Sequence, residues 1–223
     1  MNKALMSWST GKDSAYALHQ LKQLKNEFDV VGLFTTLTAS FDRTSIHGVR
    51  RKLLEAQAKR MNLSLFILEI PYPCSNEGYE SLMKDFLVTR VVSAHISHIA
   101  FGDLFLEDIR RYRETKLSSI SIQPLFPLWQ QKTKSLAHEM IDQGFKAIIT
   151  CVDSKKINDS FVGRVFDKDF IQDLPSDIDP CGENGEFHSF IYDAPLFASP
   201  IPVLVGETVK RDGFVFADLL LNE

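Results

Sequence analysis

The stretch SWSTGKDS, residues 7–14, decides the fold that this sequence predicts. It follows a short apolar run, Ala4-Leu5-Met6, and it precedes a segment with apolar residues at helical spacing. A strand that passes through a glycine-containing turn into a helix directs backbone N–H groups and the positive end of the helix dipole at one point. The turn is therefore a candidate phosphate site.

The side chains of this turn also suit an anion. Ser9, Thr10 and Ser14 offer hydroxyl donors, and Lys12 offers a positive charge. Asp13 stands where it could bind Mg²⁺ carried by phosphates. The turn matches neither the GxxxxGK[ST] pattern nor GxGxxG. An ordinary helix N-terminus with serine caps would explain the same residues, and this alternative stays open.

Short apolar runs alternate with amphipathic segments through the first part of the chain. This pattern is typical of a parallel sheet covered by helices. We expect strands at residues 3–7, 30–35, 65–70, 98–101 and 147–152. We expect helices at residues 14–25, 49–61, 80–92 and 133–143, the last of them closed by Gly144 as its C-terminal cap.

The composition changes after about residue 153, where glycine, proline and aspartate become frequent. Residues 173–190, DLPSDIDPCGENGEFHSF, are typical of a long polar loop, and such loops in compact proteins are often functional. From residue 191 onward, prolines and alternating apolar residues predict short antiparallel strands. We therefore expect an α/β domain at residues 1–152 and a smaller C-terminal lobe at residues 153–223.

The overall composition is that of an ordinary soluble enzyme, and the net charge bears on which kinds of molecule the protein could bind. The 223 residues are 44% hydrophobic and 24% charged, with a net charge of −4, which argues against nucleic acid as a partner. A secretory signal and an apolar run long enough for a membrane span are both absent from the sequence, so we expect a cytoplasmic protein. Its three cysteines form no CxxC pair and predict neither a disulfide framework nor a zinc site.

A second stretch whose side chains could bind a ligand or take part in catalysis is GDLFLEDIRRYRE, residues 102–114. Gly102 and Asp103 end a predicted strand, and a helix from Leu104 would carry a charged face at spacings of three and four. That face consists of Glu107, Arg110, Arg111 and Glu114. By its pattern alone, this face is better explained as a solvated, salt-bridged helix surface. Its position favours function, because ligands bind at the carboxyl ends of strands in open α/β sheets.

The third stretch is DPCGENGEFHSF, residues 179–190. Two glycines space Glu183, Asn184 and Glu186 on a compact loop, and His188 follows on the next strand; together these residues could orient an amine, bind a metal or position a carboxylate. Cys181, Glu183 and His188 do not have the spacing of a zinc site. Cys181 as a nucleophile lacks an activating base in the nearby sequence. His188 is either a structural histidine or a proton acceptor.

Residues 9–14 resemble the SGGxDS loop of the PP-loop ATP pyrophosphatases, which cleave ATP between its α and β phosphates. Thr10 replaces the usual first glycine and makes the loop bulkier. Together with PLFPLW (residues 124–129), CVD (151–153) and SFVGRVFD (160–167), the three stretches resemble the diphthine ammonia ligase family over nearly the whole chain. The CGENGEFH signature is the most specific part, and a serine follows it where threonine is common. The short length and residues 45–57 are more similar to bacterial members.

The resemblance implies a Rossmann-like sheet of the adenine nucleotide α-hydrolase type, with a C-terminal lobe that closes over ATP. It implies an ATP site made by the loop, with adenine along the second strand: Ser9, Thr10, Gly11, Lys12, Asp13, Ser14, Thr35, Thr36 and Gly102. It implies a substrate side built from Glu107, Arg110, Arg113, Gly182 and His188. Catalytic roles then fall to Lys12, Asp13, Asp103, Glu183 and Glu186, and Asp13 would organise Mg²⁺.

The activity implied by the resemblance is ATP-dependent amide formation. The substrate carboxylate, on a small molecule or on a protein, attacks the α-phosphorus of ATP, pyrophosphate leaves, and ammonia displaces AMP. The alternatives are a tRNA-modifying enzyme with the same ATP chemistry and a non-catalytic ATP or AMP sensor. Free ammonium is the simplest nitrogen donor because the sequence contains no glutaminase-like segment. A homodimer is one oligomeric state that we consider for the protein.

Overall fold

The computed structural model describes residues 1–44 and 48–222. Residues 45–47, which begin the segment that resembles bacterial members, and Glu223 lie outside the described part. Within the described part, no helix is both long and apolar enough to cross a membrane.

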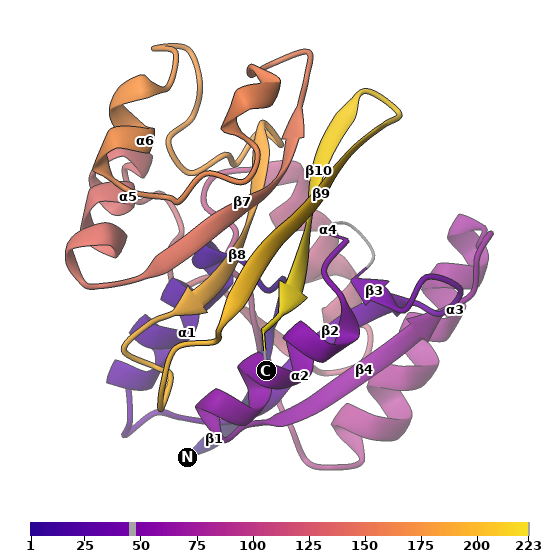
Figure 1. Cartoon of the computed structure of the whole chain (residues 1–223). Coiled ribbons are helices and arrows are strands. Elements are labelled where there is room, and N and C mark those ends of the chain that lie inside the picture. Colours follow the sequence, from indigo (N-terminus) through magenta and orange to yellow (C-terminus); the bar gives the residue numbers. More distant parts are fainter. Residues whose placement is uncertain (45–47, 223) are drawn as a thin grey trace.

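A parallel sheet forms the first half of the molecule (Figure 1). Its strands are β1 (Asn2–Ser7), β2 (Phe28–Thr38), β4 (Ser64–Ile70), β5 (His98–Ala100) and β6 (Gln123–Leu125). They lie in the order β4-β2-β1-β5-β6, every neighbouring pair is parallel, and the two-residue β3 (Arg43–Thr44) pairs antiparallel with the end of β2. The predicted α/β, Rossmann-like sheet is confirmed. The strand order reverses at β1, so the loops after β1 and β5 diverge there.

Helices cover both faces of this sheet because side chains alternate along its strands. On β1, Ala4 and Met6 join one apolar core, while Leu5 joins the other. The first core contains residues of α1 (Lys12–Gln23) and α2 (Arg51–Met61). The second contains residues of the π-helical turn η1 (Leu87–Val92) and of α4 (Glu107–Ser118), with α3 (Asn76–Phe86) packed against it.

A second, antiparallel sheet forms the other half (Figure 1). It contains β7 (Lys146–Asp153), β8 (Phe187–Asp193), β9 (Val203–Arg211) and β10 (Phe214–Leu221), in the order β8-β7-β10-β9. The strand expected at residues 147–152 exists, but its assignment to the parallel sheet was wrong. An uninterrupted buried apolar run has the same appearance in either kind of sheet. The chain therefore changes sheets before residue 146.

Shorter elements complete the second half. They are α5 (Thr133–Asp142), the 3₁₀ turn η2 (Asp159–Phe161) and α6 (Lys168–Asp173), and both helices lie beside β7 (Figure 1). Gly144 has a φ of +83° and follows the end of α5, as predicted for a helix cap. Residues 174–186 form the expected irregular loop before β8.

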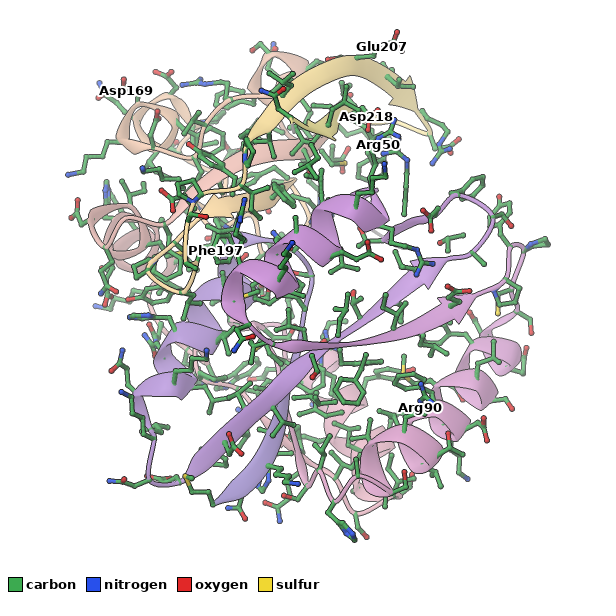
Figure 2. The ribbon with its side chains drawn as sticks, turned by 60° about the horizontal axis from the view of Figure 1, so that its bottom comes forward. Arg50, Arg90, Asp169, Phe197, Glu207 and Asp218 are labelled. Atoms are coloured by element: carbon green, nitrogen blue, oxygen red, sulfur yellow. The ribbon has the colours of Figure 1, made fainter. Side chains whose placement is uncertain are left out.

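An ion-pair cluster fastens β10 to the first half of the molecule. Asp218 on β10 accepts hydrogen bonds from Arg50 at 2.6 and 3.0 Å and from Arg43 at 2.9 Å. Figure 2 shows Arg50 and Asp218 pointing toward each other. The hydrogen bonds from Arg50 outweigh the effect of partial burial and, with help from Arg43, lower the pKa of Asp218 to about 2.

We predict that Asp218→Asn lowers the free energy of unfolding at pH 7 by about 1–2 kcal/mol. The folded-state pKa lies below the unfolded value of about 3.9, so this stabilisation is present above pH 4 and is lost as the pH falls toward 2. Urea unfolding of both proteins at pH 7 and pH 2.5 measures the difference. An equal difference at both pH values would contradict the assignment.

Candidate active site

A cavity of about 880 Å³ opens where the strand order reverses. Four of the segments that line it are far apart in the sequence: residues 7–14 after β1, the end of β2, residues 101–103 after β5, and residues 181–189 around the start of β8. Residues of α3, η1 and α4 line the rest of the cavity. A crevice outside the carboxyl ends of parallel strands is the usual ligand position in this architecture. The three stretches singled out in the sequence therefore meet at one cavity.

Thr10 occupies an unusual backbone conformation in the loop. Its φ is +71°, in the left-handed region that favours glycine, and its side chain is fully buried. The Thr10 carbonyl accepts hydrogen bonds from Gln57 Nε2 at 3.0 Å and from the backbone N–H of Ile191 at 2.9 Å. The conformation explains why the related loops carry glycine here. Within residues 1–44 and 48–222, the buried Thr10 Oγ1 has no hydrogen-bond partner.

Serine hydroxyls hold the first turn of α1 together. Ser9 Oγ donates to Ser14 Oγ at 3.0 Å, and Ser14 Oγ donates to the Gly11 carbonyl at 3.0 Å. Ser189, on β8, accepts from the backbone N–H of Lys12 at 3.3 Å. These bonds shape the loop from both halves of the molecule.

Lys12 joins the loop to the third stretch. Its ammonium nitrogen lies 3.0 and 2.9 Å from the two Asp13 oxygens and 2.5 Å from the Cys181 carbonyl, and it sits over the rings of Phe166 and Phe187. Burial lowers the pKa of Lys12, but Asp13, Cys181 and Asp179 together outweigh burial and raise the pKa overall. Lys12 is therefore a buried cation at the seam between the two halves.

Gly102 allows the loop after β5 to touch the first turn of α1. A Cβ at this position would lie 2.9 Å from both the Asp13 carbonyl carbon and the Ser14 nitrogen, which is closer than real side chains come to backbone. The next residue, Asp103, accepts from Arg113 at 2.6 and 3.1 Å, and Arg113 stacks over Phe101 at 4.2 Å. Both members of this ion pair line the cavity.

Glu183 bridges the third stretch and the second. Its Oε1 accepts from the backbone N–H of Leu104 at 2.7 Å and of Phe105 at 3.4 Å. The helix α4 begins at Glu107, three residues after Leu104, where the sequence predicted its start. Burial, supported by the nearby Asp13 and Asp103 carboxylates, raises the pKa of Glu183 to about 7.

The other titratable groups of the third stretch that we consider, Glu186, His188 and Cys181, lie in buried surroundings. Glu186 is buried, and its Oε1 accepts from Asn184 Nδ2 at 3.1 Å and from the backbone N–H of Asp179 at 3.4 Å. Burial, with the Lys12 charge, lowers the pKa of His188 to about 4, so its ring is neutral at pH 7. Burial strongly raises the pKa of the Cys181 thiol, which disfavours the thiolate needed by a nucleophile.

Most predicted site residues line the cavity, but four do not. The lining includes Ser9, Gly11, Lys12, Asp13, Ser14, Thr35, Thr36, Gly102, Asp103, Arg113, Gly182, Glu183 and His188. The lining does not include Thr10, Glu107, Arg110 or Glu186.

Arg110 and Glu107 belong to the helix surface. Arg110 stacks between Phe126 and Trp129, at 4.9 and 4.7 Å, and pairs with Glu114 at 2.7 Å, while Glu107 is exposed. The solvated-surface alternative thus describes this part of α4, and Arg113 is the arginine that reaches the cavity.

Sequence reasoning missed Gln57, a fully buried residue of α2. It accepts from Trp8 Nε1 at 2.7 Å and donates to the carbonyls of Thr10 and Ile191, so it links the loop to β8. The signal was available, because Gln57 follows Leu53 and Leu54 at helical spacing on the apolar face of α2. A polar residue on a buried face requires polar partners.

No group of three or more acidic, histidine or cysteine side chains in residues 1–44 and 48–222 is arranged to hold a metal ion. This includes the mixed set Cys181, Glu183 and His188. The Asp13 carboxylate faces Lys12 with both oxygens. Any divalent ion would therefore take most of its ligands from a bound nucleotide or water.

The Thr10 conformation yields a stability prediction. Thr10→Gly removes a side chain from a left-handed residue, while the matched control Thr10→Ala keeps a Cβ there. We expect the glycine variant to exceed the alanine variant by about 1 kcal/mol in free energy of unfolding. Urea denaturation of both proteins checks this. An alanine variant at least as stable as the glycine variant would show that the positive φ carries no strain.

Comparisons with known proteins identify the family of the chain. The family model of the diphthamide synthase N-terminal domain matches residues 1–120, and that of the C-terminal domain matches residues 132–217. Diphthine–ammonia ligases from Homo sapiens and Rattus norvegicus are each 32% identical over 94% of this chain and 85% of their own length. The Bos taurus ligase is 33% identical over 50% of this chain and 44% of its own length.

Among solved structures, the chain resembles the U34-tRNA thiolase NcsA from Methanococcus maripaludis with a TM-score of 0.37 and 14% identity, over 64% of this chain and 58% of that chain. The family models, by contrast, account for both halves of the molecule, and the human relative aligns along nearly all of it. The chain belongs to the diphthamide synthase family.

Proposed function

We propose that the protein is an ATP-dependent ligase that adenylates a substrate carboxylate, releases pyrophosphate and forms an amide with ammonia. One observation carries the proposal. The loop at residues 9–14 and the CGENGE loop meet at the cavity where the strand order reverses, in a chain whose curated relatives are diphthine–ammonia ligases. No observation favours a tRNA-modifying enzyme or a nucleotide sensor.

The first half of the molecule would hold ATP. The N-terminus of α1 and its loop present backbone N–H groups and a positive dipole end to the phosphates, and Thr35 and Thr36 at the end of β2 would line the adenine subsite. The second half, with the CGENGE loop, would close the substrate side. Gly102 supports both subsites, because only a residue without a side chain allows the loops to meet so closely.

Asp13 would contribute the protein's ligand to Mg²⁺. A carboxylate is a ligand type that Mg²⁺ prefers, and the residues around Asp13 leave the remaining positions to phosphate oxygens and water. The ion, when bound with ATP, would neutralise charge on the departing pyrophosphate. Burial raises the pKa of Asp13, and the Lys12 ammonium opposes that rise and would fix the direction of the carboxylate.

The acceptor carboxylate and ammonia would bind beside charged side chains of opposite sign. Arg113, held by Asp103, is the cation on the acceptor side. Glu183 is a carboxylate at the cavity wall with a pKa of about 7, which suits a group that binds ammonium and accepts its proton. Glu186 fixes the loop that carries Glu183. The homodimer and the cytoplasmic location inferred from the sequence stay predictions.

The first test is the product pair formed from ATP. With Mg²⁺, ammonium and a pool of cellular carboxylates, we expect AMP and pyrophosphate. Asp13→Asn should reduce AMP formation by on the order of 100-fold. The exposed Asp169→Asn, on α6, is the matched control and should be active. Formation of ADP and phosphate instead, or unchanged activity of Asp13→Asn, would contradict the proposal.

The second test concerns Glu183. Because ionised Glu183 is the active form in this account, amide formation should rise with pH around a midpoint near 7, and Glu183→Gln should abolish that rise. Glutamine retains an oxygen for the Leu104 N–H, so the loop stays in place. ATP–pyrophosphate exchange, which needs no ammonia, is the internal control and should retain its pH profile. An identical loss of exchange would assign Glu183 to adenylation instead.

A further inference from the structure

Asp179 lies on the same irregular loop as Glu183, four residues before it, and is not among the described residues that line the cavity. Its carboxylate oxygen Oδ2 accepts a hydrogen bond from the backbone N–H of Glu183 at 2.8 Å. Its backbone carbonyl accepts from the N–H of Gly182 at 2.9 Å, and its own N–H donates to Glu186 Oε1 at 3.4 Å. This one residue therefore holds the loop at three places.

Two glycines turn the chain sharply on either side of Glu183. Gly182 has a φ of +73° and Gly185 a φ of +78°, both in the left-handed region that favours glycine. Glycine also has the greatest conformational freedom to lose on folding, so a loop with two of them needs hydrogen bonds to adopt one shape. The bond from the Glu183 N–H to Asp179 lies between the two glycines, where the backbone most needs it.

The side chain of Glu183 is held separately from its backbone. Its Oε1 accepts from the Leu104 N–H at 2.7 Å, across the cavity wall from the loop. A glutamate side chain has several rotatable bonds, and ordering them has an entropic cost. Since Asp179 already fixes the backbone, the bond to Leu104 has only the side chain left to order.

A second contact to this loop comes from the solvent side. Lys156 donates from its ammonium to the Asn184 carbonyl at 2.5 Å, but the Lys156 side chain is 42% exposed. Hydrogen bonds from long, solvated side chains contribute little to a fixed geometry. The Asp179 carboxylate is shorter and belongs to the loop itself, so it is the stronger restraint on Glu183.

We propose that Asp179 is the positioning residue for Glu183: by holding the Glu183 N–H, it keeps the Glu183 carboxylate at the cavity wall, where ammonium would bind. The inference rests on the proposed function for what the Glu183 carboxylate does. The restraint itself is a property of the protein without substrates. If Asp179 only completed a turn, its loss would leave Glu183 where it is.

The first test is a titration of the glutamate carboxyl groups by ¹³C NMR in the protein without nucleotide, with the Glu183 signal assigned by Glu183→Gln. Asp179→Ala removes the acceptor, so the Glu183 carboxyl should leave its buried position and its pKa should fall from about 7 to below about 6. Asp179→Asn keeps an oxygen acceptor and should leave the pKa of Glu183 near 7. The matched control Asp177→Ala changes an exposed carboxylate of the same loop and should also leave it there.

The second test compares two steps of the reaction. Asp179→Ala should lower kcat/KM for ammonium by on the order of tenfold and leave ATP–pyrophosphate exchange unchanged, and Asp179→Asn should restore amide formation. Should the alanine variant lose its fold by circular dichroism, Asp179→Glu replaces it, because the longer side chain keeps the charge but moves the acceptor by one methylene.

A Glu183 pKa that stays near 7 in the variant without the acceptor, or equal effects of the alanine and asparagine variants, would overturn the inference. The titration involves no turnover. Failure of the ligase activity and failure of the positioning role are therefore distinguishable.

Discussion

The buried ammonium of Lys12 is the interaction on which the site depends. It sits at the start of α1, yet its hydrogen bonds go to its neighbour Asp13 and to the carbonyl of Cys181, which is 169 residues further along the chain. A buried cation requires such partners, since an unpaired charge in the interior costs several kcal/mol. The two sheets are therefore held in the one arrangement that brings the phosphate loop and the CGENGE loop together.

Other features near this ion pair also fix the position of the two loops, and they lower the stability of the folded protein. Thr10 holds a left-handed conformation, and its carbonyl is fixed by Gln57 and Ile191. Glu183 is held at the cavity wall with a raised pKa, so this carboxyl costs stability as the pH rises from about 4 through about 7. Strain and unfavourable ionisation that persist at a cavity are typical of functional sites, where the surrounding structure fixes them.

The sequence was most informative about features that neighbouring residues determine by themselves. The alternation of apolar runs and amphipathic segments predicted the parallel sheet, and the position of Gly102-Asp103 after a strand predicted their place at the site. It could not tell Glu183 from Glu186, because the two lie three residues apart on an irregular loop whose turns decide which side chain faces the cavity. The choice between Arg110 and Arg113 likewise depends on how α4 is rotated against Phe126 and Trp129. The buried run at residues 147–152 predicted a strand but could not name its partners.

The central claim is that the loop at residues 9–14 holds the phosphates of ATP at the point where Gly102 meets α1. The most direct test is a crystal structure with Mg²⁺ and the non-cleavable analogue α,β-methylene ATP. The account predicts the α-phosphate within hydrogen-bonding distance of the loop, with the adenine near Thr35 and Thr36. A nucleotide bound elsewhere, or one with only its γ-phosphate at the loop, would contradict it.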